Sequence, residues 1–245
     1  MRRNVGHRLE RRLHRSKERA ERRSGADNAR GRILETSKRL FAEQGFEGVT
    51  VRDICREADA NLALVNYHFG DKLGLYLEVV NDAVVKISAF NSLTMDAPAG
   101  SSAEERLEYF IRTLLRLVFD EHAAKETWIH KLIQHEMTRP TAAADQILQI
   151  AIAPRIRYLS GIVAELLDCP IKDPRVLQCV SSVHGLCLIY LRYVQLPEAF
   201  RQKMPELMVP RPHSPDAAAD HVIAFSMAGI REIRGRGSRK PRPSS

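Results

Sequence analysis

Polar side chains suited to contact with nucleic acid occur close together between residues 50 and 72. Asn66 carries an amide that can donate to and accept from an adenine edge, or bond a phosphate if it faces the rim of a groove. Tyr67 and His68 can donate to phosphate oxygens, and Lys72 adds positive charge near them. The full set of candidate DNA contacts is Thr50, Arg52, Asn61, Leu62, Ala63, Asn66, Tyr67, His68 and Lys72. This set predicts recognition of double-stranded DNA, provided that the folded chain presents it on one surface.

A second group of side chains, His122, His130, His135 and Glu136, has donor atoms that can bind a metal. Ligands on one helix usually stand three or four residues apart, whereas His130 and His135 are five apart. The chain also lacks an HExxH motif. The spacing therefore disfavours a metal-dependent enzyme or a metal sensor, and we expect no catalytic residue, no bound metal and no cofactor.

Helices are the elements that must position the first group. A periodicity of 3.6 residues recurs from residue 29 onward, whereas strand-like alternation is scarce. We therefore predict an all-α fold. Its first helix should run from about residue 29 to residue 44, with Asp27 or Asn28 as its cap and Gly45 as its end.

The start of the next helix is specified by two devices at once. Thr50 can act as the N-cap, with Asp53 at the N3 position of a capping box. Val49 and Ile54 occupy the two positions of a hydrophobic staple. Asp53 is therefore expected to cap the helix rather than to contact DNA.

A third, shorter helix should follow after a turn near Ala58 or Asp59. Asn61 can cap this helix, which should continue through about residue 68. Two short helices joined by three or four residues form a helix-turn-helix, whose second helix can enter the major groove of DNA. The expected buried residues of this second helix are Val65 and Phe69, while Leu62 and His68 suit either packing or DNA contact.

The stretch TVRDICREADANLALVNYHFGDK at 50–72 resembles the DNA-binding signature of the TetR family. The resemblance extends over about 30–84 and includes the sequence FAEQGF at the end of the first helix. It implies a regulator, most often a repressor, that leaves its DNA operator when a small molecule binds its second domain. Two residues depart from the usual pattern. Asp59 replaces a turn glycine, which the fold tolerates because Asp adopts left-handed conformations more readily than most residues. Asn66 replaces a tyrosine, so the operator sequence does not follow from the family.

The rest of the chain is predicted to be helical as well. Asp71 can cap a fourth helix that connects two domains. Further helices are expected at about 103–121, 124–138, 142–168 with a kink or break at Pro154, 173–195 and 216–234. The segment QHEMTRPT at 134–141 resembles the C-terminal domain of the CecR branch of the family. That resemblance implies a homodimer formed through about 173–195 and 216–234, and a pocket for an unidentified effector.

Residue patterns add to this expectation. The helix at 173–195 has a broad apolar face, and Ser181, Ser182 and Gly185 would allow a second helix to approach closely. The alternative is a helix buried within one subunit. The candidates for lining the effector pocket are Tyr109, Arg112, Trp128, His130, His135 and Tyr190, together with Glu136 and His184.

The net charge of +8 on the 245-residue chain is concentrated at its two ends. Residues 1–26 carry +7 and residues 231–245 carry +5, which leaves 27–230 at −4. Such tails either strengthen binding to a polyanion or only keep the protein in solution. A protein that packages nucleic acid without specificity is the rival reading, but the well-capped body disfavours it. The predicted organisation is a disordered basic arm at 1–26, a helix-turn-helix domain at 27–87 with the motif at about 50–69, a helical effector-binding and dimerisation domain at 88–234, and a basic tail at 235–245.

Targeting and membrane signals are weak in this sequence. The first 26 residues lack the apolar segment of a secretory signal, although an Arg-rich presequence or an overlong start are alternatives. The most apolar predicted helix, at 176–194, contains His184 and Arg192 and falls short of a membrane span. The four cysteines form no CxxC pair and fit reduced thiols. We therefore predict a protein of the bacterial cytoplasm that joins the nucleoid when bound to DNA, with no membrane segment.

Overall fold

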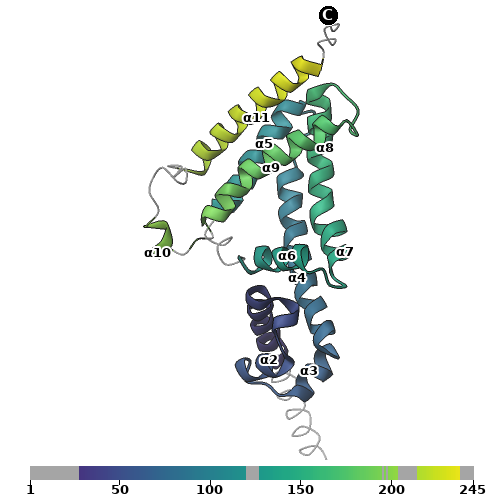
Figure 1. The fold of residues 1–245 in the computed structure, drawn as a ribbon, viewed down its shortest axis with the longest axis vertical. Coiled ribbons are helices and arrows are strands. Elements are labelled where there is room, and N and C mark those ends of the chain that lie inside the picture. Colours follow the sequence, from purple (N-terminus) through teal and green to yellow (C-terminus); the bar gives the residue numbers. More distant parts are fainter. Residues whose placement is uncertain (1–27, 120–126, 195, 197, 204–213, 238–245) are drawn as a thin grey trace, which may run out of the picture. The chain divides into compact units, whose positions relative to one another are not determined.

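The computed structural model describes residues 28–119, 127–194, 196, 198–203 and 214–237 (Figure 1). These residues form helices and contain no strand, which confirms the all-α prediction. Contacts divide the chain into two compact units. Unit 1 comprises residues 1–83 and 128–144, and unit 2 comprises 84–127 and 145–245. The contiguous boundary predicted near residue 87 differs from this division, because residues 128–144 return to unit 1. The basic arm at 1–26 and most of the basic tail lie outside the described residues.

Unit 1 contains the predicted helix-turn-helix. Its elements are a helix over 28–48, α2 (Val51–Glu57), α3 (Leu62–Phe69), the first half of α4 (Lys72–Met95) and most of α6 (Thr127–Thr138). Each helix contributes one apolar side to a common core. The fully or almost fully buried side chains include Ile33, Leu40, Phe41, Ile54, Val65, Phe69, Leu75, Tyr76 and Val79. Three aromatic rings pack together here: Tyr76 lies edge-on against Phe41 with centroids 5.0 Å apart, and tilted against Phe46 with centroids 4.9 Å apart.

The first helix continues beyond its predicted end. It is helical over 28–48, whereas the sequence predicted its end at Gly45. Gly45 nevertheless has a φ of 72°, in the left-handed region that favours glycine. A Cβ atom there would lie 3.0 Å from Nδ1 of His135 in α6. The lack of a side chain at Gly45 therefore permits both the left-handed backbone turn and the close approach of α6.

Unit 2 is a helical bundle built around α5 (Ala103–Phe119), α8 (Ala153–Leu167), α9 (Pro174–Val194) and α11 (Pro215–Gly237). α5 packs against the other three, and α8 packs against α9 and α11 (Figure 1). Their shared core includes Leu107, Phe110, Ile111, Leu115, Leu159, Ile162, Val180, Val183 and Val222. A short helix that the sequence did not predict, α10 (Glu198–Arg201), lies between α9 and α11 along the chain.

The predicted break before Pro154 takes the form of a π-helix. α7 (Ala144–Gln146) is followed by the π-helical segment η2 (Ile147–Ile152), and α8 begins with Pro154 in its first turn. Proline has no N–H and its ring clashes with the preceding turn, so the helix widens on its N-terminal side. Nδ2 of the buried Asn91, in α4, donates to the carbonyl oxygen of Ala151 at 2.7 Å. This bond satisfies a carbonyl at the distorted turn.

One stretch, Ala144–Leu167, is long and apolar enough to cross a membrane by length and composition alone, with a mean hydropathy of 1.3. The sequence had instead indicated 176–194 as the most apolar helix. The core helices of globular proteins pass the same test. In this structure α8, which forms most of the stretch, packs against α5, α9 and α11.

Candidate nucleic-acid interface

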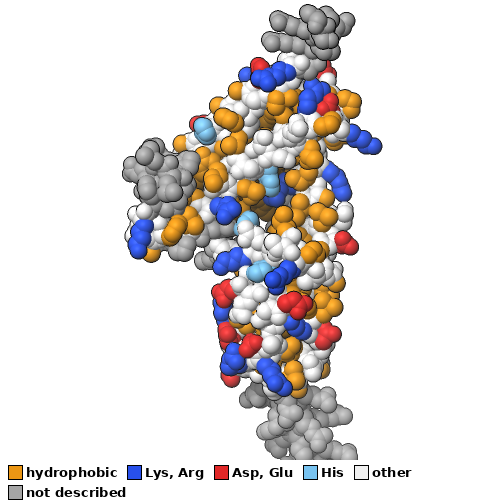
Figure 2. Space-filling model, viewed as in Figure 1, with side chains coloured by type: hydrophobic (Ala, Val, Ile, Leu, Met, Phe, Trp, Pro, Cys, Tyr) orange, Lys and Arg blue, Asp and Glu red, His pale blue; other side chains and the backbone are white. Residues whose placement is uncertain are grey.

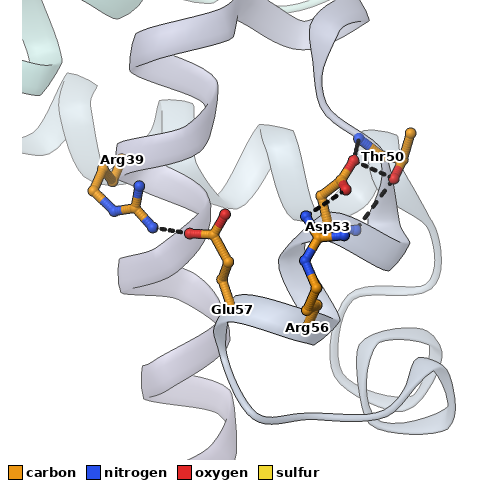
Figure 3. A network of polar contacts seen from close by, with 5 residues as sticks. All are labelled: Arg39, Thr50, Asp53, Arg56 and Glu57. Atoms are coloured by element: carbon orange, nitrogen blue, oxygen red, sulfur yellow. Dashed lines mark hydrogen bonds and ion pairs between the residues drawn. The ribbon is translucent and has the colours of Figure 1, made fainter.

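The N-terminus of α2 is closed by the predicted capping box (Figure 3). The Oγ1 atom of Thr50 accepts from the backbone N–H of Asp53 at 3.2 Å, and Oδ2 of Asp53 accepts from the backbone N–H of Thr50 at 3.2 Å. Val49 and Ile54, the two residues of the predicted staple, are both buried. The hydrogen bonds from Thr50, aided by Arg56 at 2.8 Å, lower the pKa of Asp53. Asp53 therefore remains an ionised cap, as predicted.

Two ion pairs flank this cap. Arg56 pairs with Asp53 within α2, while Glu57 at the end of α2 pairs with Arg39 of the first helix (Figure 3). The second pair joins the helix-turn-helix to the scaffold behind it. Both pairs are largely exposed, so their main effect is to fix orientation rather than to add much stability.

The turn between α2 and α3 is held from the first helix. Asp59 adopts a left-handed φ of 48°, as expected for a position where glycine is usual. Arg32 donates from Nε to the carbonyl oxygen of Ala58 and from a terminal nitrogen to that of Asp59, each at 3.1 Å. The first of these carbonyls belongs to the C-cap of α2 and the second to the next residue, and carbonyls at a helix end have no partner within the helix. One arginine thus fixes the angle between the two helices of the motif.

α3 presents most of the candidate DNA contacts on one exposed side. Oδ1 of Asn61 caps the helix by accepting from the backbone N–H of Leu64 at 2.9 Å. Leu62 is 51% exposed and Tyr67 is 80% exposed. The exposed residues of this row are Asn61, Leu62, Ala63, Asn66 and Tyr67. Val65 and Phe69 are buried, which confirms their predicted packing role and leaves Leu62 on the outer side.

The remaining candidates lie in different surroundings. Thr50 and Arg52 are exposed at the start of α2. His68 is half-buried beside the rings of Tyr67 and Phe69, and its Nε2 atom is buried without a hydrogen-bond partner among the described residues. The structure thus favours local packing for His68. The ammonium of Lys72 lies 4.3 Å from the centroid of the Phe46 ring, so in this conformation it contacts the protein.

A glycine that the sequence analysis did not single out, Gly74, lies in the first turn of α4 close to the end of α3. Oδ1 of Asp71 caps α4 by accepting from the backbone N–H of Gly74 at 2.7 Å. A Cβ atom on Gly74 would lie 2.1 Å from the carbonyl oxygen of Phe69, the last residue of α3. Only a glycine permits this approach. The sequence does contain a signal for this contact. An isolated glycine lowers the stability of a helix, so a glycine within the apolar stripe of a helix indicates that close packing requires it there.

Several predicted pocket and metal residues instead belong to unit 1. Glu136 is buried and accepts from Oη of Tyr76 at 2.5 Å, and from the backbone N–H and the hydroxyl of Thr141 at 3.0 and 2.8 Å. Burial and this bond raise the pKa of Tyr76, so it remains a donor. Trp128 lies under the ammonium of Lys38 at 5.5 Å. His130 contacts Gln134, and His135 lies against Gly45. His122 lies outside the described residues.

The other four pocket candidates lie in unit 2, where His184 is half-buried on α9. Arg112 forms ion pairs with Glu108 at 2.8 Å and with Asp220 at 2.7 Å. Tyr109 donates to the carbonyl oxygen of Leu93 at 3.4 Å, and Tyr190 is buried in the core. The structure therefore divides the eight pocket candidates equally between the two units.

Comparison with known families assigns both parts of the chain. Residues 33–79 match the family of bacterial regulatory proteins named for TetR, and residues 103–230 match the C-terminal domain of the HTH-type transcriptional dual regulator CecR. The first match covers the helix-turn-helix described above. The second covers more than half of the chain.

Individual relatives agree with this assignment. The chain is 22% identical to CecR of Shigella flexneri over 173 residues, which is 67% of this chain and 76% of that protein. It is 24% identical over 140 residues to the probable regulator YttP of Bacillus subtilis, covering 56% of this chain and 64% of YttP. The transcriptional repressor AcnR of Corynebacterium glutamicum is 36% identical over 61 residues, covering 25% of this chain and 32% of AcnR.

A solved structure shows the same fold. The TetR-like transcriptional regulator of Rhodococcus sp. RHA1 superposes with a TM-score of 0.56 at 16% identity, covering 82% of this chain and 95% of that one. These families and relatives are transcription regulators rather than enzymes. The chain therefore belongs to the TetR family of DNA-binding transcription regulators, with a C-terminal domain of the CecR type.

Proposed function

We propose that the exposed side of α3 reads a specific operator from the major groove. The observation that carries this proposal is the row from Asn61 to Tyr67, which is exposed although its helix is anchored by Val65 and Phe69. The Oδ1 atom of Asn61 is used by the cap, so Asn66 is the residue of the row with a whole amide available for a base edge. Tyr67 is placed to donate to a phosphate or a base at the rim.

Binding to the DNA that flanks the gene tests this proposal. We expect Asn66→Ala and Tyr67→Ala each to weaken binding to the specific site by about 10- to 100-fold, because each lost base or phosphate contact is worth roughly 1–3 kcal/mol. Asn81→Ala is the matched control, since Asn81 is an exposed asparagine of unit 1 on α4. Fluorescence anisotropy at two salt concentrations measures the affinities. Equal binding of all variants to every DNA would contradict operator reading by α3 and favour nonspecific binding by the basic tails.

The same proposal includes a homodimer formed through α9 and α11. Beyond its buried side, α9 exposes Ser181, Ser182 and Gly185, with Leu177 60% and Ile189 44% exposed. α11 has a comparable side, where Phe225 is 61% exposed. Small exposed residues beside it on α11 are Ala217, Ala224, Ala228 and Gly229. Two such helix pairs would bury these apolar sides in a four-helix interface, and a dimer matches the two half-sites of an operator.

Phe225→Arg should disrupt this dimer. The substitution places an unpaired charge in the proposed interface, and removing such a charge from water costs several kcal/mol. We expect the dimer dissociation constant to rise by about 100-fold or more, as measured by sedimentation. Met137→Arg is the control, because Met137 is an apolar residue of α6 that is 74% exposed and lies in unit 1. An unchanged dimer in Phe225→Arg would exclude this interface.

We further infer that the protein represses its target genes and leaves the operator when a small molecule binds unit 2. AcnR is named a repressor and CecR a dual regulator, which supports transcriptional control with repression as the main mode. The site of action would be the bacterial cytoplasm, at the nucleoid. Release of operator DNA by a ligand that binds unit 2 is the result that supports this part of the proposal.

A further inference from the structure

An arginine interrupts the buried side of α8. Arg155 stands four residues after Ala151 and four before Leu159, so all three share one side of the helical stretch. Ala151 and Leu159 are 0% exposed, and Ile162, one turn further, is also 0% exposed. The guanidinium of Arg155 therefore enters a position where the helix otherwise buries apolar side chains.

This cation has no counterion among the described residues. Its Nε atom is buried without a hydrogen-bond partner, and none of its nitrogens forms an ion pair or hydrogen bond there. Three other arginines of unit 2 do have such a partner. Arg112, Arg116 and Arg175 each pair with an aspartate at 3.0 Å or less. Arg157 and Arg192 also form no ion pair among the described residues, but both are exposed, whereas the Nε atom of Arg155 is buried and burial lowers its pKa.

The groups of α9 that interact electrostatically with Arg155 are uncharged at neutral pH. They are Cys187 and His184. Burial raises the pKa of Cys187 to about 12, so the thiol keeps its proton. Burial and the neighbouring Arg155 lower the pKa of His184 to about 4, so its ring is neutral. Neither group neutralises the guanidinium.

Placing a cation in the core without a partner is costly, and proteins almost always pair or coordinate such charges. Arg155 and His184 are both half-buried rather than sealed, so a molecule from solvent can reach them. In Figure 2, histidine and Lys/Arg atoms show between hydrophobic side chains on the visible face of unit 2.

We infer that Arg155 and His184 form an anion-binding subsite for the effector, which is a small, mainly apolar organic anion. Its carboxylate or phosphate oxygens accept from the guanidinium, with the imidazole N–H of His184 as a second donor. Ile152 and Ile156, which flank Arg155 in the chain, are only partly buried, and they favour a molecule whose remaining part is largely apolar. This inference rests on the proposed role of unit 2 as an effector-binding domain.

The test compares Arg155→Met with Arg157→Met in the full-length protein. Arg157 is an exposed arginine of the same helix with only a long contact to Gln149 at 3.4 Å. The probes are decanoate, decyl phosphate and decanol, titrated by calorimetry and by thermal melting. We expect at least one of the two anions to bind the wild type and Arg157→Met about 10- to 100-fold more tightly than Arg155→Met, the usual effect of losing a hydrogen bond to a charged group. Decanol should bind all three proteins alike.

Arg155→Lys keeps the charge but loses the planar fork, so its affinity should fall between those of the wild type and Arg155→Met. It also provides the comparison if the methionine variant folds poorly. The inference is overturned if neither anion binds the wild type, or if both bind it no more tightly than they bind Arg155→Met. A weaker dimer in Arg155→Met, seen by sedimentation, would also overturn it, since a carboxylate of the second subunit would then be the partner.

Failure of the proposed function can be distinguished from failure of the anion-binding subsite by measuring operator binding. Operator affinity without ligand should be the same in Arg155→Met and the wild type, because the substitution lies outside unit 1. An anion that binds through Arg155 without releasing the operator would leave the subsite intact and contradict ligand-controlled repression.

Discussion

Gly74→Ala is expected to destabilise unit 1 by about 1–2 kcal/mol net and to weaken specific DNA binding at physiological temperature. The added methyl group would lie 2.1 Å from the carbonyl oxygen of Phe69, a backbone atom that cannot move without shifting the end of α3. Overpacking of this kind costs about 1–3 kcal/mol or more. The gain in helix propensity from glycine to alanine, about 1 kcal/mol, offsets only part of the clash. Urea unfolding and operator titration measure the two effects.

Gly161→Ala is the matched control for this substitution. Gly161 also lies inside a helix, α8, but a Cβ atom there would meet nothing within 4 Å. The control should therefore be as stable as the wild type or more stable by up to about 1 kcal/mol. If both alanine variants gain stability, the close approach of α3 to α4 is not a constraint on the protein.

Glu136→Ala should destabilise unit 1 by about 2–4 kcal/mol. The substitution leaves the hydroxyl of Tyr76 and the backbone N–H of Thr141 without their acceptor. Tyr76 is 0% exposed, so water does not replace the lost bond, and each unsatisfied buried donor costs roughly 1–3 kcal/mol. Because α6 then loses its polar anchor, operator affinity should fall together with the unfolding midpoint.

A double-mutant cycle with Tyr76→Phe isolates the bond itself. The two substitutions together should cost less than the sum of the single effects, with a coupling energy of about 1–3 kcal/mol. Glu47→Ala, at an exposed residue of unit 1, should change stability by less than about 0.5 kcal/mol. Strict additivity would mean that Glu136 and Tyr76 do not depend on one another.

The parts of the fold that were predictable are those that local chemistry determines. The cap at Thr50, the left-handed turn at Asp59 and the burial of Val65 and Phe69 follow from residue type and short-range periodicity. The widened turn before Pro154 follows from the missing N–H of proline. Each of these features involves residues within about one or two helical turns of each other.

Features that join distant segments were not predictable in the same way. The aromatic and acidic residues of α6 were assigned to an effector pocket because their types suit one. Their packing against Tyr76, Lys38 and Gly45 depends on contacts across 60 or more residues of sequence. The sequence analysis did not single out Arg155, because basic residues are mostly exposed and only the fold shows that its Nε atom is buried.

The discontinuous make-up of unit 1 also governs when this protein can fold during its synthesis. The helix-turn-helix leaves the ribosome first, but Trp128, His135 and Glu136 follow more than 50 residues after Tyr76. At translation rates of about 5–20 residues per second, the helix-turn-helix segment exists for several seconds before α6 is synthesised, and during that time the hydroxyl of Tyr76 has no partner from α6. A DNA-reading head grafted onto another protein by cutting near residue 87 would remain permanently in that unfinished state. A graft that also carries residues 128–144 would complete it.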